Sequence, residues 1–181
     1  KIEYYVLNKG VLNVAHDYVQ TGSAVNYEIS KTLGIPARED LILGEENRRL
    51  KLLQNRLNIN ILTGSQLNGQ EDNMAYPTES CLAGGKGQIR KPDGCNIMLP
   101  PTKAELLAIE MITNNKRGFD KTLKCNRIEH IVKGRANEFE NEHIKVAEYL
   151  NLGTGRVYPI CVMNKDNEPL NIPPTIIKKE N

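Results

Sequence analysis

Tryptophan is absent from this sequence, and no apolar run approaches the roughly 20 residues that a membrane-spanning helix requires. The first residues, KIEYY, do not have the features of a secretory signal peptide. The lack of a long apolar run and the lack of signal-peptide features argue against a protein that spans or crosses a membrane. We therefore expect a cytoplasmic protein without a membrane partner.

Closely spaced cysteines are also lacking. None of the four cysteines belongs to a C-x-x-C motif, and they are far apart in the sequence: Cys81, Cys95, Cys125 and Cys161. The three histidines are equally scattered: His16, His130 and His143. Zinc sites rely on ligand pairs at short spacing, so this pattern does not indicate one. Reduced thiols are the expectation for a cytosolic protein.

Charge of one sign is not in large excess either. Lysine and arginine total 24 residues against 22 of aspartate and glutamate, which leaves a net charge of +2. This balance excludes the overall basic field of a histone-like protein, so any contact with nucleic acid must come from a local patch. The length of 181 residues and the apolar content of 39% predict one domain with its own core.

Helices and strands are expected to alternate in the first part of the chain. Helical spacing of apolar residues, ended by glycine or proline, predicts helices at residues 2–9, 24–33 and 37–57. Short apolar runs predict buried parallel strands at residues 11–15, 59–62 and 95–99. The stretch from Gly69 to Lys91 has few large apolar residues, which is typical of a long surface loop.

The second part of the chain has a different pattern. Thr102 and Glu105 form a T-x-x-E capping box, which predicts a helix as far as about Ile112. Strands are expected at residues 128–133, 144–149 and 157–162, with a turn at residues 137–141. The fold class is therefore α/β: a parallel sheet flanked by helices, with antiparallel strands at its C-terminal end. The predicted domain covers residues 1–163, and residues 164–181 form an extended or loose tail.

Asp17 follows the first predicted strand. A carboxylate there lies at the carboxyl edge of a parallel sheet, where α/β folds bind their ligands. In P-loop ATPases such an aspartate holds Mg²⁺, usually through water. Aspartate is also frequent after strands because it favours turns, so this position alone leaves both interpretations open.

Gln66 ends the next predicted strand, in the sequence T-G-S-Q. A glutamine at the tip of an adjacent strand can contact a phosphate or an attacking water. It can then transmit the state of the nucleotide to a neighbouring loop. The alternative is a polar residue that merely ends the strand.

The order of these motifs resembles DnaB-type replicative DNA helicases. D-Y-V-Q at residues 17–20 is similar to the segment after the Walker B strand of that family, and L-T-G-S-Q-L-N at residues 62–68 is similar to its S-Q-L-N strand end. The resemblance covers residues 11–149, with a spacing closest to phage-type members. It implies a RecA-like ATPase core in which Asp17 binds Mg²⁺ and Gln66 senses ATP.

The segment I-V-K-G-R, residues 131–135, extends the resemblance. It is similar to the K-x-R element with which the family reaches into the ATP site of a neighbouring subunit. The resemblance implies that Lys133 and Arg135 neutralise charge on the γ-phosphate, and an arginine finger of this kind is worth about 10³–10⁵ in rate. The alternative is two solvated charges before a turn.

The glycine-containing segment at residues 84–90 is similar to a loop that lines the DNA channel of the hexamer. Backbone N–H groups and basic side chains in such a loop hold successive phosphates of a single strand. The candidate contacts to single-stranded DNA are Gly85, Lys86, Gly87, Gln88 and Arg90. The alternative is a basic loop without a ligand.

The sequence departs from the family because it contains no G-x-x-x-x-G-K-[ST] motif. That loop cradles the phosphates of ATP, and in the family it lies upstream of the segment that this chain matches. We therefore expect a downstream part of a motor domain that hydrolyses no ATP by itself. His16 stands where the family has an apolar residue, and it is expected to be packed rather than catalytic.

Two functions are compatible with these motifs. The first is part of a hexameric 5′–3′ replicative helicase in a bacterial cell or phage-infected host, which uses ATP and Mg²⁺ and binds single-stranded DNA. Its expected partners are further copies in the ring, primase and a helicase loader. The second is a RecA-like module without catalysis that binds single-stranded DNA or docks on a helicase. A third, an unrelated small α/β enzyme, would need a deep pocket away from Asp17 and Gln66.

The missing phosphate loop favours the module without catalysis. Four retained residues favour the helicase, because a module without catalysis does not need them: Asp17, Gln66, Lys133 and Arg135.

Overall fold

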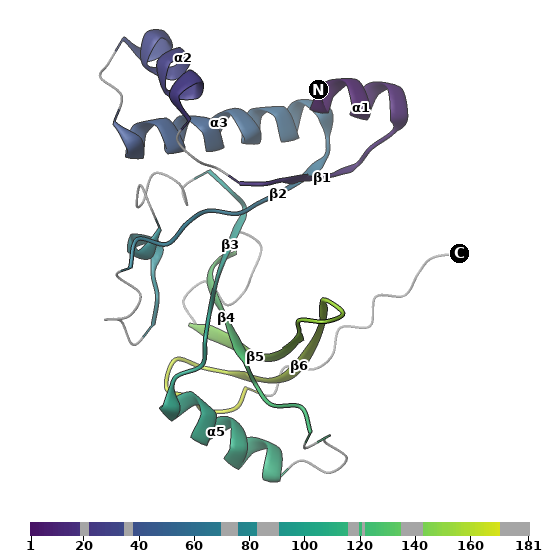
Figure 1. The fold of residues 1–181 in the computed structure, drawn as a ribbon, viewed down its shortest axis with the longest axis vertical. Helices are drawn as coiled ribbons and strands as arrows, with labels where there is room; N and C mark the ends of the chain where they lie inside the picture. Colours follow the sequence, from purple (N-terminus) through teal and green to yellow (C-terminus); the bar gives the residue numbers. More distant parts are fainter. Residues whose placement is uncertain are drawn as a thin grey trace. The chain divides into compact units, whose positions relative to one another are not determined.

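The computed structural model describes residues 1–18, 22–34, 38–69, 76–82, 91–115, 120, 122–134 and 143–170. The chain divides into two compact units, Lys1–Gly94 and Cys95–Asn181. Figure 1 shows the helices and strands of each. No helix in the described part of the chain is both long and apolar enough to cross a membrane.

The helices of the first unit are α1 (Ile2–Lys9), α2 (Ser23–Leu33) and α3 (Glu39–Leu57). The helices α1 and α2 end at Gly10 and Gly34, both left-handed with φ of 65°, as the sequence predicts. Asn58 ends α3 in the same conformation. The expected start of α3, Ala37, lies outside the described residues.

Two short strands of the first unit, β1 (Asn13–His16) and β2 (Asn60–Thr63), pair in parallel. The parallel direction is as predicted, but the expected burial is wrong. Leu12 is 63% exposed and Leu62 is 76% exposed. Among the described residues of this unit, α3 lies along one face of the pair (Figure 1), whereas parallel sheets are normally covered on both faces.

The predicted surface loop of residues 69–91 is only partly described. Its residues 76–82 contain the short 3-10 helix η2 (Glu79–Cys81). Pro77 and Cys81 are fully buried, and Leu82 forms a β-bridge with Leu67. The prediction of a surface position is therefore wrong for Pro77, Cys81 and Leu82, because these isolated apolar residues in a polar stretch are buried in the unit.

The second unit contains a four-stranded sheet in the order β3-β4-β5-β6. Its strands are β3 (Gly94–Leu99), β4 (Arg127–Gly134), β5 (Ile144–Asn151) and β6 (Arg156–Met163). The predicted antiparallel pairing is confirmed for β4 with β5 and for β5 with β6. A correction concerns β3, which was expected in the parallel sheet but belongs to the sheet of β4–β6. Strands that are close in the sequence commonly pair, and α5 lies between β3 and β4 in the described part of the chain.

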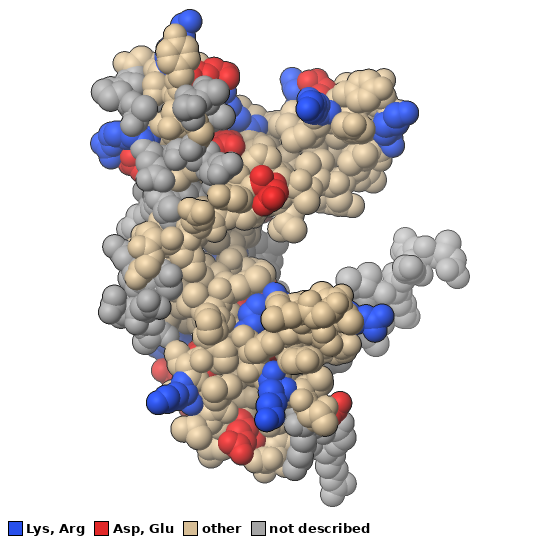
Figure 2. All heavy atoms as spheres, in the orientation of Figure 1, with Lys and Arg blue, Asp and Glu red and all other residues tan. Residues whose placement is uncertain are grey.

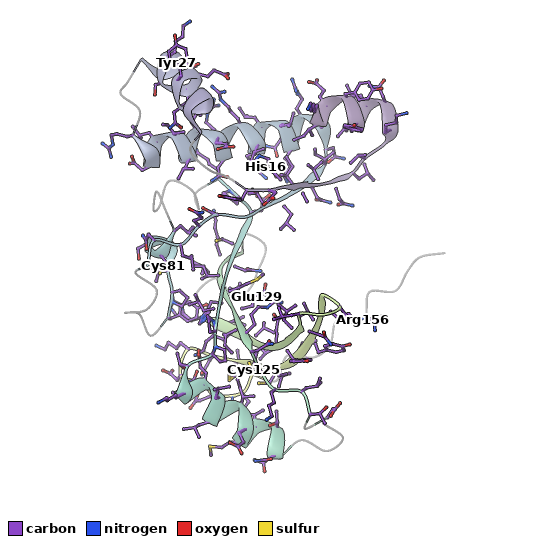
Figure 3. All side chains as sticks on the ribbon, viewed as in Figure 1. His16, Tyr27, Cys81, Cys125, Glu129 and Arg156 are labelled. Carbon is purple, nitrogen blue, oxygen red and sulfur yellow. The ribbon has the colours of Figure 1, made fainter. Side chains whose placement is uncertain are left out.

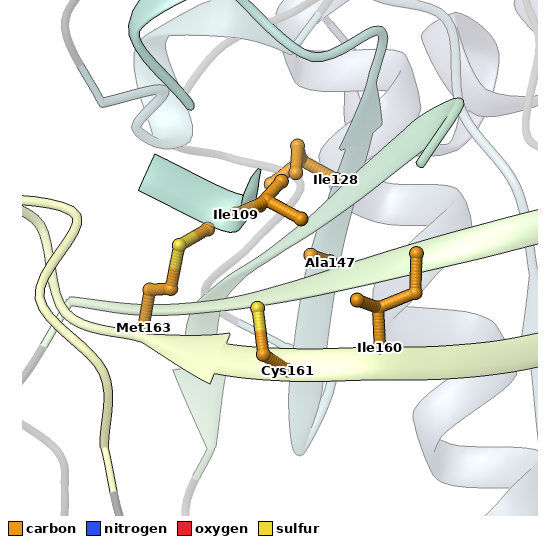
Figure 4. Packing of buried hydrophobic residues seen from close by; sticks show 6 residues of the cluster. All are labelled: Ile109, Ile128, Ala147, Ile160, Cys161 and Met163. Carbon is orange, nitrogen blue, oxygen red and sulfur yellow. The ribbon is translucent and has the colours of Figure 1, made fainter. Parts of the chain in front are cut away.

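Helix α5 (Lys103–Asn114) begins with the predicted capping box. The Glu105 amide donates to Thr102 Oγ1 at 3.3 Å, and the Thr102 amide donates to Glu105 Oε2 at 2.8 Å. Helix α5 contributes Ile109 to a buried cluster with residues of β4, β5 and β6 (Figure 4): Ile128, Ala147, Ile160, Cys161 and Met163. This cluster is the hydrophobic core of the second unit.

A buried ion pair lies beside this core. Lys145 Nζ is 3.1 Å from Glu105 Oε1, and the two side chains are only 1% and 5% exposed. Lys145 also donates to the carbonyl oxygen of Lys165 at 3.3 Å and to Asn167 Oδ1. The ion pair therefore ties the start of α5 to β5 and to the turn that begins the predicted tail.

Candidate functional site

The carboxyl ends of β1 and β2 form the candidate site. The two strands are in register, so that His16 lies beside Thr63. Asp17 follows β1 directly and Gln66 follows β2 after two further residues, which places both at the same edge of the sheet. The structure thus brings together two residues that the sequence predicts at one edge.

Tyr18 and Gln66 connect the two segments beyond the strands. Gln66 Nε2 donates a hydrogen bond to the hydroxyl oxygen of Tyr18 at 3.3 Å. The side chain of Gln66 is exposed, and that of Tyr18 is half-buried. A change at Gln66 can therefore reach the residue that follows Asp17 through one direct contact.

His16 fastens the two strand ends to each other. Its Nδ1 lies 3.1 Å from Thr63 Oγ1, while Thr63 Oγ1 donates to the carbonyl oxygen of His16 at 3.0 Å. His16 points from β1 toward α3 (Figure 3), where its Nε2 is 3.9 Å from Glu46 Oε1. The expectation of a packed histidine agrees with this half-buried position.

Glu46 is the residue at this edge that the sequence does not indicate. Burial raises the pKa of its carboxyl group, although the nearby His16 opposes the shift. Its Oε2 is buried and has no hydrogen-bond partner among the described residues. In the sequence Glu46 is one of many charged residues of α3, and only the packing of α3 on β1 distinguishes it.

Asp17 has an exposed carboxylate. Within the described ranges this carboxylate makes no hydrogen bond or ion pair, and no group of three His, Cys, Asp or Glu residues there is arranged to hold a metal ion. A single free carboxylate is what a water-mediated Mg²⁺ contact needs, because Mg²⁺ takes its other ligands from water and substrate phosphates.

Lys133 lies on β4 of the second unit, where a strand is predicted, and it is half-buried. Its charge acts on Cys95, but burial dominates there and raises the pKa of the Cys95 thiol. Arg135 lies outside the described residues.

The proposed DNA-binding residues Gly85, Lys86, Gly87, Gln88 and Arg90 lie outside the described residues as well. Over the face shown in Figure 2, lysine and arginine side chains are interspersed with acidic ones. This distribution agrees with the small net charge.

A pocket of about 220 Å³ adjoins the same strands. It is lined by α3, β2 and residues 92–94, and an ion pair between Lys51 and Asp93 lies at its rim. Thr63 belongs both to this pocket and to the bond with His16. Thr63 is thus the residue that the lining of this pocket shares with the contacts at the candidate edge, whereas Asp17 and Gln66 do not line it.

No model of a known protein family matches the chain. Among curated proteins, the chain is similar to the SPbeta prophage-derived uncharacterized protein YorI of Bacillus subtilis (strain 168), with 32% identity over 181 residues. The match covers 98% of this chain and 35% of that protein, so the chain spans about a third of its length. The name of this relative gives a prophage origin and no activity.

Proposed function

We propose that this chain is part of the motor domain of a DnaB-type hexameric replicative helicase, which couples ATP hydrolysis to movement along single-stranded DNA. The parallel pairing of β1 with β2 is the observation that carries the proposal. It sets Asp17 and Gln66 at one edge, although they come from motifs far apart in the sequence. The prophage origin of the relative supports a phage-type member.

In this proposal Asp17 would hold Mg²⁺ through water. The ion would neutralise negative charge on the phosphates of ATP. Gln66 lies where it can sense the γ-phosphate or the attacking water. Its hydrogen bond with Tyr18 links that sensing to the segment after Asp17. The bonds between His16 and Thr63 hold the two strand ends at a fixed spacing.

Lys133 and Arg135 serve the ATP site of a neighbouring copy in the proposed ring. The phosphate-binding loop belongs to a part of a longer protein outside these residues. Residues 84–90 bind the single strand through backbone and Lys86 contacts.

Binding of the purified chain to fluorescent single-stranded DNA across a salt series tests the DNA contact. We expect binding that weakens as salt rises, because phosphate contacts release counterions. Lys86→Ala should weaken binding, whereas Lys31→Ala, an exposed lysine of α2, is the matched control and should not. No binding by the unaltered chain at low salt would contradict the proposal.

ATP hydrolysis separates the helicase from a module without catalysis. We expect no magnesium-dependent turnover by the purified chain, and robust turnover would contradict our assignment of the phosphate loop to another segment. A longer protein that contains this chain should hydrolyse ATP, and Asp17→Asn in it should abolish turnover while single-stranded DNA binding persists. A longer protein that binds DNA but never hydrolyses ATP would favour the module.

A further inference from the structure

The hairpin of β5 and β6 carries a second set of residues suited to nucleic acid. Tyr149 and Tyr158 are direct partners across this hairpin. Their rings stack with centroids 6.1 Å apart and an interplanar angle of 29°. Arg156 lies two residues before Tyr158 in the same strand, and therefore on the same face. Figure 3 shows Arg156 at the outer end of the hairpin.

A shift in strand register places Tyr158 on the same face of the hairpin as Tyr149. Ala147 pairs with Cys161 but Glu148 pairs with Pro159, so Ile160 is an extra residue in β6. With strict alternation, Tyr158 would face away from Cys161. The extra residue lets both Ile160 and Cys161 join the core under α5, and Tyr158 stays on that face with Tyr149. Such bulges re-aim side chains and are frequent next to functional sites.

Of these three residues, Arg156 is the most accessible, and Tyr149 also packs against the hydrophobic core. Both tyrosines are half-buried and Arg156 is exposed. Within the described ranges, the guanidinium of Arg156 makes no ion pair, and neither tyrosine hydroxyl makes a hydrogen bond. By contrast, Arg127 on β4 is neutralised by Glu148, with Nη2 2.6 Å from Oε2. Arg156 is thus placed to accept an anion from outside the unit.

We propose that Tyr149, Tyr158 and Arg156 form a stacking surface for single-stranded DNA. One base stacks on the ring of Tyr158, and Arg156 contacts an adjacent phosphate. Base stacking on aromatic side chains tolerates any sequence, and removal of one such contact lowers affinity by about 5- to 150-fold. This inference rests on the proposed function, since it adds a second DNA contact apart from residues 84–90.

A stacked tyrosine pair also stabilises a hairpin without any ligand, and a site-specific reporter distinguishes the two roles. The chain contains no tryptophan, so Tyr158→Trp introduces a single fluorophore that keeps an aromatic face at this position. We expect oligo-dT to quench its fluorescence as a base stacks on it. Tyr27→Trp is the matched control, because Tyr27 is 70% exposed on α2 of the first unit, and its fluorescence should not change.

Affinity measurements complete the test. Tyr158→Ile keeps a residue with high β-strand propensity but removes the aromatic face, and we expect binding to oligo-dT to weaken about tenfold. Arg156→Gln should weaken binding several-fold and reduce the salt slope by about 0.7, the value for one phosphate contact on a single strand. Lys103→Gln, an exposed lysine of α5, is the control and should change neither. If the circular dichroism signal shows that Tyr158→Ile does not fold, the affinity of Arg156→Gln and the fluorescence of the tryptophan reporter test the proposal.

The outcomes separate this inference from the function on which it rests. Binding that depends on Lys86 but is unchanged by Arg156→Gln, with no quenching of the tryptophan at position 158, overturns the stacking surface and leaves the helicase proposal standing. No binding by the unaltered chain at low salt overturns both.

Discussion

The two units of this chain hold their strands in different ways. In the second unit, β4, β5 and β6 are consecutive in the sequence, pair with each other and bury a shared cluster with Ile109 of α5. In the first unit, two helices separate β1 from β2, and Leu62 of that pair is 76% exposed. Polar contacts such as those of His16 with Thr63 join the strand ends there.

This difference teaches where stability and candidate chemistry reside. Asp17, Tyr18 and Gln66 lie on the unit whose sheet buries less apolar surface, and they make few contacts within it. Loop and edge residues with few structural duties are free to bind ligands, whereas residues of a packed core are constrained by packing. We therefore expect substitutions in the buried core of the second unit to change stability, and those at the edge of β1 and β2 to change function.

The largest effect on stability is expected from Lys145→Met, which leaves Glu105 buried without its counter-charge. Breaking a buried pair in this way costs about 3–5 kcal/mol in free energy of unfolding. Urea denaturation would measure this loss of stability. Hydrogen exchange should show faster exchange of the β5 amides, with the β1 amides of the first unit as the comparison. The double variant Lys145→Met, Glu105→Gln should recover much of the lost stability, because the side-chain amide is neutral and can still accept from Thr102 at the start of α5. A loss below about 1 kcal/mol in the single variant would mean that the pair is solvated.

Removal of core volume should have the next largest effect. Ile128 is fully buried in the cluster under α5, so Ile128→Ala is expected to cost about 2–5 kcal/mol. Leu62→Ala, on the exposed face of β2, is the matched variant and should change stability by about 0.5 kcal/mol or less. Equal losses in the two variants would show that the face carrying Leu62 is covered in solution.

Acid should weaken the second unit through His130. Burial lowers the pKa of His130 to about 4, from 6.5 for an unperturbed histidine. Between these values the unfolded chain binds more protons than the folded one, so stability falls as pH falls from about 6.5 to about 4. The slope from this group is at most about 1.4 kcal/mol per pH unit. Thermal unfolding at several pH values should show a shallower dependence for His130→Gln. An unchanged slope would contradict the burial of this imidazole.

The smallest effects on stability are expected at the candidate edge. Tyr18→Phe removes only the exposed hydrogen bond to Gln66, and a change within about 0.5 kcal/mol is expected. Asp17→Asn should leave the midpoint of thermal unfolding unchanged, because the Asp17 carboxylate makes no hydrogen bond or ion pair within the described residues. A large loss of stability in either variant would give the edge a structural role and weaken its assignment as a nucleotide site.

Local signals predicted the elements well. The capping box of Thr102 and Glu105 and the helix ends at Gly10 and Gly34 are present as the sequence indicates, because each depends on residues within one turn. The strands were predicted near their observed positions for the same reason. The placement of Asp17 and Gln66 at one edge also followed from the sequence, because parallel strands share a carboxyl edge.

Non-local features were not predicted. The pairing of β3 with β4, the burial of Cys81 and the ion pair of Lys145 depend on which segments meet in space. Lys145 in particular sits in a strand whose alternation gives no sign of a fully buried charge. The extra residue at Ile160 also follows from pairing, because a bulge is defined only against a partner strand.

The sequence by itself determined which segments form helices and strands, where they end and which chemical groups follow β1 and β2. Helical spacing, capping and strand length depend on residues that are close in the sequence. The tertiary structure decided how the strands are grouped into two sheets, which face of each is covered, and which charges are buried in pairs. These choices depend on contacts between residues distant in sequence, whose free energy appears only when the packed unit excludes water.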